Sequence, residues 1–192
     1  MVENVLAIRV TDDVLLDPDA YRAAALALPF TDIEAGPIVF HGMAAVGSSP
    51  LSVWLEAMFG LHTTYSAFRQ SPAGQVEPHL IHDDRSMGEW SAILYLTPDP
   101  PHGDGTCFYE SRQTGARVAT TMPGTDDWLA TAHDWFDQDR WACWRRVDAK
   151  FNRVVVFPSA CFHARAIPHN YGTVADGTAR LIQIAFGDEV LS

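Results

Sequence analysis

Residues 78–96 read PHLIHDDRSMGEWSAILYL, and this stretch decides how the chain folds. An apolar run lies near each end of it, and a polar segment lies between the two runs. We therefore predict strands over residues 78–83 and 91–96. The first of these strands runs into His82-Asp83-Asp84, so polar side chains follow directly on an apolar strand.

Short runs of the same character continue through the rest of the chain. We predict further strands over residues 65–69, 106–110, 141–147, 152–157 and 180–186, and one helix around residues 125–136. The turn signals between strands are Ser71-Pro72-Ala73-Gly74, Pro98-Asp99-Pro100-Pro101, Gly103-Asp104-Gly105 and Asp176-Gly177. About seven short strands in this arrangement indicate a mainly β protein with flanking helices, a double-stranded β-helix of the jelly-roll, cupin-like type.

Helical signals precede these strands. Asp17 is a typical N-cap and Pro18 a typical first helical residue, which predicts a helix that stops at Pro29. Apolar residues at helical spacing predict a second helix over residues 50–59. Residues 4–10 alternate enough to form a first strand. We expect the N-terminal helices to pack on the outer face of one sheet.

The length of the chain corresponds to one domain. Its 192 residues, 47% of them hydrophobic, compare with about 150 residues for a typical domain. No repeat or linker divides the chain. We expect a single domain over residues 1–192, in which residues 1–62 supply the N-terminal strand and helices and residues 63–192 form the jelly-roll core.

The charge balance argues against nucleic acid as a partner. Lysine and arginine together number 13 and aspartate and glutamate 24, which gives a formal net charge of −11. A field of this sign repels phosphate backbones. The apolar runs fall far short of the roughly 20 residues that a membrane helix needs. We therefore expect neither a nucleic-acid partner nor a membrane partner.

The cysteines and the N-terminus indicate a cytoplasmic protein. The first residues, Met1-Val2-Glu3-Asn4, lack the basic and apolar segments of a secretory signal. The cysteines are odd in number and form no CxxC pair, which is typical of free thiols in a reducing compartment. They are Cys107, Cys143 and Cys161.

The residues His82 and Asp84 could ligate a metal ion. Residues i and i+2 of a strand point to the same face, so one imidazole and one carboxylate can meet at one point. A two-histidine, one-carboxylate triad of the kind that holds Fe(II) needs a second histidine. His163 is favoured because it follows the apolar strand over residues 152–157. The other candidates are His102, His133 and His169.

A single arginine interrupts the last apolar strand. Arg180 lies among the apolar residues of 179–186. A buried guanidinium is costly unless an anion neutralises it, and a bidentate carboxylate is a natural partner. The alternative is an arginine at the mouth of a strand that pairs with a surface acid.

The order of these motifs resembles that of the Fe(II)/2-oxoglutarate-dependent dioxygenase superfamily. The motifs are His82-x-Asp84, then Gly105-Thr106-Cys107-Phe108, then Phe157-Pro158 before His163, and then Arg180. Within the superfamily the chain is similar to small prolyl-hydroxylase-like members and to an uncharacterised bacterial and phage group. The resemblance to that group is greatest over residues 86–96 and 151–158, and the whole match covers roughly residues 64–187.

The resemblance implies an enzyme and its cofactors. His82, Asp84 and His163 would be the catalytic iron ligands, and Arg180 would bind the far carboxylate of 2-oxoglutarate. Tyr95 lies where such enzymes often place a polar contact to the cosubstrate. The implied activity is oxygenation of an unactivated C–H bond with Fe(II), 2-oxoglutarate and O2, with succinate and CO2 as coproducts. Because Asp84 is retained, hydroxylation is favoured over halogenation.

The substrate implied by the resemblance is a small molecule, an amino acid or a peptide-like compound. Arg69 and Glu110 are polar residues placed to recognise an amino-acid-like group, although both could simply lie on solvated strand faces. Further substrate contacts are expected from residues 167–173.

Three alternatives remain open on the sequence. The interval from His163 to Arg180 is longer than usual in the superfamily, so residues 167–178 must form an inserted loop. Arg165, two residues after His163, is the competing anchor for 2-oxoglutarate. The protein could also be a cupin-like metalloenzyme that uses the triad without 2-oxoglutarate. Finally, it could be a non-catalytic jelly-roll binding module.

Overall fold

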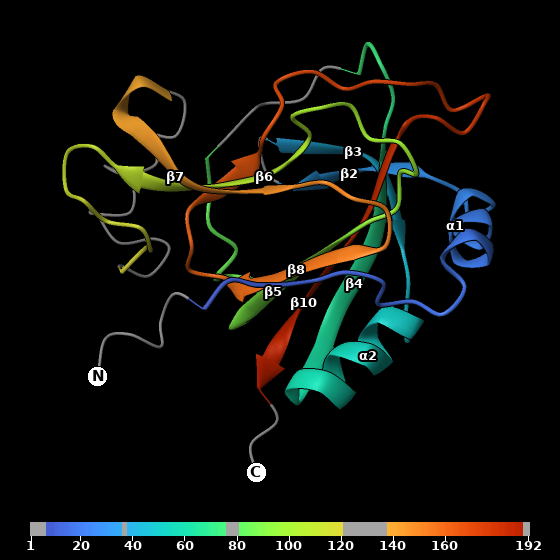
Figure 1. Cartoon of the computed structure of the whole chain (residues 1–192), viewed down its shortest axis with the longest axis horizontal. Helices are drawn as coiled ribbons and strands as arrows, with labels where there is room; N and C mark the ends of the chain where they lie inside the picture. The colour runs from blue at the N-terminus through green and yellow to red at the C-terminus, as the bar shows by residue number, and fades with distance from the viewer. Residues whose placement is uncertain (1–6, 36–37, 76–80, 121–137, 190–192) are drawn as a thin grey trace.

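Two antiparallel sheets make up the core of the computed structural model, which describes residues 7–35, 38–75, 81–120 and 138–189 (Figure 1). The larger sheet has seven strands in the order β1-β8-β5-β10-β4-β3-β2, and the smaller has three in the order β7-β6-β9. The larger sheet contains β1 (Arg9–Thr11), β2 (Thr31–Ala35), β3 (Ile38–Ala45), β4 (Leu61–Ser71), β5 (Trp90–Tyr95), β8 (Arg153–Pro158) and β10 (Arg180–Glu189). The smaller contains β6 (Gly105–Ser111), β7 (Trp141–Asp148) and β9 (His163–Arg165). The predicted mainly β, double-stranded β-helix fold is confirmed.

Strand β10 divides the core into two layers because its side chains alternate between the faces of the large sheet. Leu181 and Ala185 join the cluster that includes Leu51 and Leu55 of the helical layer. Ile182 instead joins the cluster between the sheets, with Tyr95, Phe108, Val155 and Phe157 among its members. One face of the large sheet is therefore covered by helices, and the other faces the small sheet across the interior.

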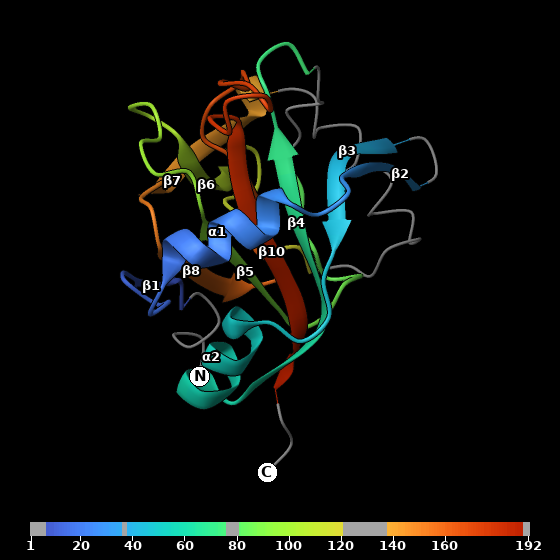
Figure 2. The same cartoon turned by 90° about the vertical axis from the view of Figure 1, so that its right-hand side faces the viewer.

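Both N-terminal helices begin where their sequences predict; the second also ends there, whereas the first ends at Leu26, before Pro29. Helix α1 (Pro18–Leu26) is capped by Asp17, whose Oδ1 accepts from the Ala20 amide at 3.0 Å. Helix α2 (Pro50–Phe59) begins at Ser49 and ends at Gly60, which has the left-handed conformation of a C-cap. Both helices pack on the same face of the large sheet (Figure 2), as expected.

Several predicted elements differ in the structure. The segment between α1 and α2 forms the strands β2 and β3, which we did not predict. The strand expected over residues 78–83 is reduced, in its described part, to an isolated bridge between His82 and His163. The helix expected around residues 125–136 and residues 4–6 of the strand expected over residues 4–10 lie outside the described residues; the described part of that strand overlaps β1. In the described part of the chain, no helix is long and apolar enough to cross a membrane.

All the cysteines of the chain are free thiols, and their different burial can be tested with a thiol reagent. All three are unpaired, with Cys107 and Cys161 buried and Cys143 exposed. Burial raises the pKa of the Cys161 thiol to about 12, which suppresses the reactive thiolate at neutral pH. We expect a thiol reagent such as Ellman's to label Cys143 in the native protein and the other two only after unfolding. Reductant should leave the melting temperature nearly unchanged, whereas a fall of many degrees would show a disulfide.

Candidate metal centre

His82, Asp84 and His163 meet at one end of the interior, although they come from distant parts of the sequence. Each offers one ligand atom, and these atoms all lie within 4.8 Å of one another. The backbone holds the two histidines side by side, because the His82 amide donates to the His163 carbonyl at 3.0 Å and the His163 amide donates back at 2.8 Å. Their ring centroids are 4.4 Å apart.

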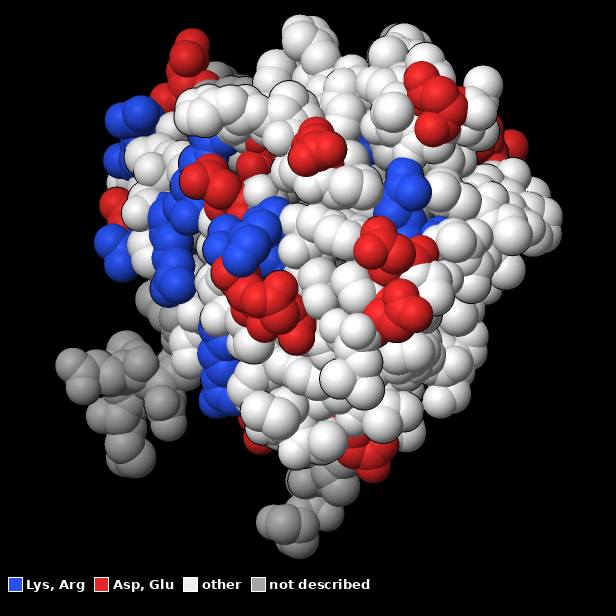
Figure 3. All heavy atoms as spheres, turned by 45° about the vertical axis from the view of Figure 1, so that its right-hand side comes forward, with Lys and Arg blue, Asp and Glu red and all other residues white. Residues whose placement is uncertain are grey.

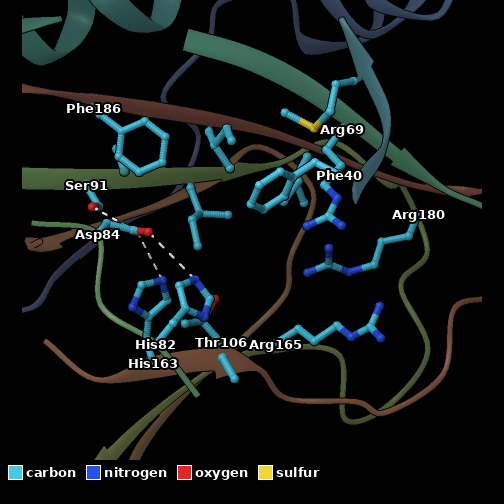
Figure 4. Close-up of a pocket in the computed structure, with 16 residues that line it drawn as sticks. Phe40, Arg69, His82, Asp84, Ser91, Thr106, His163, Arg165, Arg180 and Phe186 are labelled. Carbon is cyan, nitrogen blue, oxygen red and sulfur yellow. Dashed lines mark hydrogen bonds and ion pairs between the residues drawn. The ribbon is translucent and has the colours of Figure 1, made fainter. Parts of the chain in front are cut away.

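The carboxylate of Asp84 lies between the two imidazoles (Figure 4). Oδ1 is 3.7 Å from His82 Nε2, and Oδ2 is 3.3 Å from His163 Nε2. The Asp84 amide donates to the Ser159 carbonyl at 2.8 Å, which fixes the backbone at this point. Asp83 points elsewhere and accepts from Arg85 Nε at 2.8 Å. Asp84 thus faces the two histidines while Asp83 faces away from them, so the three ligands are held close together without a metal ion.

The ring of His163 is oriented for ligation through Nε2. Its Nδ1 is 3.0 Å from the Cys161 carbonyl, which can only accept, so Nδ1 carries the hydrogen. Nε2 is then left for a metal ion, the usual arrangement for ligating histidines. Phe157 packs edge-on against the ring, with centroids 4.7 Å apart. The orientation of the His163 ring is therefore fixed by packing against Phe157 and by the hydrogen bond from Nδ1 to the Cys161 carbonyl.

The charges of the triad stabilise one another. Burial by itself would raise the pKa of Asp84, but the nearby His163 and His82 hold it below its usual value. Burial would likewise lower the pKa of His163, but the Asp84 carboxylate raises it. The site thus keeps an ionised carboxylate in a buried place, which a bound cation also favours. Two imidazoles and one carboxylate are the donor set of the Fe(II) facial triad, which leaves coordination positions open.

Two buried serines support Asp84 from outside the ligand set. Ser91 on β5 donates to Asp84 Oδ2 at 3.2 Å, and its Oγ is 2.9 Å from that of Ser159. Sequence analysis did not identify Ser91 as part of the site. A lone hydroxyl on a buried strand next to a candidate ligand is the signal that could have found it.

Removing the Ser91 hydroxyl should weaken metal binding. We expect Ser91→Ala to lower Fe(II) affinity about 10-fold, the lower end of the 10- to 100-fold loss seen when groups that orient metal ligands are mutated, because the Asp84 backbone stays fixed. Anaerobic titration with Fe(II) measures this. Ser66→Ala is the matched control, since Ser66 is also a buried, hydrogen-bonded serine of the large sheet but does not line the cavity; its Oγ donates to the Ile184 carbonyl and accepts from Gln183 Nε2. Equal losses in both variants would contradict a role for Ser91.

A cavity of about 160 Å³ extends from the triad between the sheets. Figure 4 shows the triad at one end and the guanidinium groups of Arg69, Arg165 and Arg180 at the other. The apolar side chains that line it are Phe40, Met43, Ala92, Ile93, Ala164, Ile182, Ile184 and Phe186. A metal ion and an anion could therefore occupy the same cavity.

Arg180 is buried, as predicted, and its first partner is an internal acid. Its Nε donates to both carboxylate oxygens of Asp104, at 3.0 and 3.1 Å. Asp104 also accepts from the Tyr171 hydroxyl at 2.8 Å and from the Gly105 amide at 2.7 Å. Sequence analysis treated Asp104 only as a turn residue. The buried charge of Arg180 is thus offset within the protein, by a buried acid rather than by a surface one.

The outer edge of the Arg180 guanidinium is turned into the cavity. Among the residues that the structure describes, only Nε of this side chain takes part in hydrogen bonds. Figure 4 shows its terminal nitrogens directed toward the space between the arginines. Two parallel N–H groups are therefore presented to a ligand in the cavity, a geometry that suits a carboxylate.

The other predicted site residues differ in where they lie. Arg165 lines the cavity, and its Nη1 donates to Asn170 Oδ1 at 2.5 Å. Arg69 lines it from β4. Tyr95 does not line the cavity itself, but its hydroxyl is 2.7 Å from Oγ1 of Thr106, which does. Glu110, on β6, does not line the cavity. Its carboxylate accepts from Arg117 Nε at 2.6 Å, so its placement does not support contact with a ligand in the cavity.

Comparisons with known proteins agree with this architecture. The model of a family of unknown function, DUF6445, matches residues 45–182. No curated protein matches the chain. The crystal structure of SnoK, a non-haem α-ketoglutarate-dependent carbocyclase from nogalamycin biosynthesis, is similar at a TM-score of 0.59 and 18% identity, over 96% of this chain and 80% of that one.

Two further solved structures have the same fold. A prolyl-4-hydroxylase from Pseudomonas putida has a TM-score of 0.54 at 16% identity, over 95% of this chain and 93% of that one. HygX from Streptomyces hygroscopicus, solved with nickel and 2-oxoglutarate bound, has a TM-score of 0.52 at 13% identity, over 96% and 83%. At these identities the likeness shows a shared fold.

Proposed function

The chain belongs to DUF6445, a family of unknown function, and from its site we propose that it is a non-haem Fe(II)/2-oxoglutarate-dependent oxygenase. One observation carries the proposal. A two-histidine, one-carboxylate cluster and the free edge of a buried arginine lie at the two ends of one cavity. 2-Oxoglutarate has a keto-acid group at one end and a carboxylate at the other, so it matches both.

Each residue would have a defined role. His82, Asp84 and His163 would hold Fe(II), and the terminal nitrogens of Arg180 would bind the far carboxylate of 2-oxoglutarate. Asp104, which accepts from Nε, keeps the guanidinium from rotating. When bound, Fe(II) and 2-oxoglutarate supply the oxidising power that activates O2, with succinate and CO2 as products. The protein's own part is to position these groups and to exclude water with the apolar wall of β5 and β10.

The ligand set also bears on the outcome of the reaction. Asp84 supplies a carboxylate, so the metal would keep all three protein ligands. We therefore propose hydroxylation, or a related oxidation of a C–H bond, rather than halogenation. The substrate would be a small organic molecule, which the three lining arginines and the apolar wall would bind.

One observation favours a second candidate function. Because Asp104 already neutralises Arg180, the burial of this arginine does not by itself require a ligand anion. A cupin-like metalloenzyme that uses the triad without 2-oxoglutarate would have the same protein contacts.

Anaerobic spectroscopy distinguishes the two functions. Fe(II) and 2-oxoglutarate added together are expected to give a weak visible charge-transfer band. Zn(II) in place of Fe(II) is the control and should give none, because Zn(II) has no accessible higher oxidation state and so cannot transfer an electron to the keto acid. Fe(II) binding without a band would favour the cupin-like enzyme. Absence of Fe(II) binding would leave a non-catalytic binding module.

A further inference from the structure

The cavity gathers cationic side chains in a protein that is acidic as a whole. The chain has a formal net charge of −11, and on the face drawn in Figure 3 acidic and basic side chains lie next to one another. Among the described residues that line the cavity there are three arginines and one acid, Asp84. Clefts lined by one sign of charge concentrate ligands of the opposite sign. Asp104 offsets the charge of Arg180 from behind the cavity wall, so Arg69 and Arg165 contribute most to its attraction for anions.

The three arginines lie at different depths. Arg180 is 5% exposed and is held by Asp104, whereas Arg69 and Arg165 are only partly buried. A cavity of about 160 Å³ is smaller than the 300–1,000 Å³ of sites that enclose a drug-sized ligand. A cosubstrate at Arg180 would fill most of it. Anything else that binds must extend from the shallower part, where Arg69 lies.

Apolar side chains lie close to Arg69. On β4 it pairs in register with Met43 on one side and with Ile182 on the other. Its guanidinium lies 5.8 Å from the centroid of the Phe40 ring, which is 36% exposed at the edge of the cavity. Figure 4 shows Phe40 and Arg69 together at the side of the cavity away from the triad. A ligand here would meet a guanidinium group with aromatic and aliphatic side chains beside it.

We propose that the substrate of this enzyme is an organic acid with an apolar body, whose anionic group binds Arg69 while the body packs against Phe40 and Met43. The inference rests on the proposed function, because it assigns Arg180 to 2-oxoglutarate and leaves the shallower arginine to the substrate. A guanidinium binds carboxylates and phosphates alike through paired N–H donors. Both kinds of acid are therefore tested.

Calorimetric titration with three matched probes tests the proposal. 4-Phenylbutyrate and 3-phenylpropyl phosphate supply the two anions, and 4-phenylbutanamide is the neutral counterpart of the first. The titrations use the full chain loaded with Zn(II) and saturating 2-oxoglutarate, so that no turnover occurs. At least one acid is expected to bind about 10-fold or more tightly than the amide, because a charge-assisted contact is made only by the acid. The tighter acid identifies the anion.

Variants of arginines locate the contact. Arg69→Gln should abolish the preference for the acid, and Arg69→Lys, which keeps the charge but not the fork, should retain part of it. Arg112→Gln is the matched control, since Arg112 is exposed, does not line the cavity and donates through Nε to the Trp141 carbonyl. Thermal melting checks that each variant folds.

The outcomes separate this inference from the proposed function. No preference for either acid in the wild type, or a preference that survives Arg69→Gln and disappears in Arg180→Gln, would overturn the inference while leaving the charge-transfer test untouched. An Arg69-dependent preference without a charge-transfer band would instead retain the anion site and remove the oxygenase.

Discussion

Replacing His163 with alanine is expected to lower the affinity for Fe(II) by more than about 100-fold. Loss of a group that merely orients a ligand costs 10- to 100-fold, and this substitution removes a ligand itself. His163 is also the most enclosed member of the triad, with a side chain 5% exposed against 40% for His82. Water can replace the lost nitrogen at His82 more readily than at His163. The alanine variant of His82 should therefore lose less affinity.

Anaerobic titration with Fe(II) provides the measurement, and His102→Ala is the control. His102 is exposed and does not belong to the cluster of ligand atoms, so its loss should leave the affinity unchanged. His79→Ala is also expected to keep iron, because His79 is three residues from His82; this residue lies outside the described structure. If His163→Ala bound Fe(II) as tightly as the wild type, the assignment of the ligands would be wrong.

The triad could be proposed from sequence because each of its residues lies in a recognisable local pattern. His82 and Asp84 are two residues apart, and His163 follows an apolar strand that the pattern Val154-Val155-Val156-Phe157 makes plain. The reason for their meeting is nevertheless tertiary. Asp84 is placed by the hydrogen bond from its amide to the Ser159 carbonyl rather than by strand geometry, because residues 83–89 form no strand.

No local pattern identified Asp104 as a residue of the site. It lies between Gly103 and Gly105 in what looks like an ordinary turn, and its partner Arg180 is 76 positions away. Short-range patterns contain no information about a pair at this separation. Ser91 is only 7 positions from Asp84, but its role depends on a hydrogen bond across a turn that the strand pattern does not specify.

The hairpin of β2 and β3 was missed for a different reason. Its sequence alternates weakly and is interrupted at Gly36-Pro37, while Ile33 and Val39 are partly exposed. An edge hairpin that buries little apolar surface gives little periodic signal. Its position matters for function, because β3 supplies Phe40 and Met43 to the wall of the cavity. The part of the site that would determine the substrate was thus the least predictable from sequence.

Replacing Arg180 with glutamine is expected to weaken 2-oxoglutarate binding by about 10- to 150-fold, or about 1.5–3 kcal/mol, which is the range for a lost charge-assisted contact. Glutamine keeps much of the bulk but lacks the charge and the paired donors. Fe(II) affinity should change little, since the three ligands lie at the other end of the cavity. Anaerobic titration with 2-oxoglutarate, followed by the charge-transfer band, measures the effect.

The Asp104 contact requires a second variant. Arg180→Gln leaves the buried Asp104 carboxylate without its cation, and breaking a buried pair from one side costs about 3–5 kcal/mol of folding stability. The double variant Arg180→Gln, Asp104→Asn removes both charges, retains an acceptor for Tyr171 and should recover much of that stability. It should still bind 2-oxoglutarate as weakly as the single variant, which separates loss of the anchor from loss of the fold.

Arg165→Gln tests the competing anchor: if this variant alone lost affinity for 2-oxoglutarate, Arg165 would replace Arg180 as the residue that binds its far carboxylate. If 2-oxoglutarate bound equally well to all these variants, the cavity would not recognise it through either arginine, and the cupin-like metalloenzyme would be the better account of the triad.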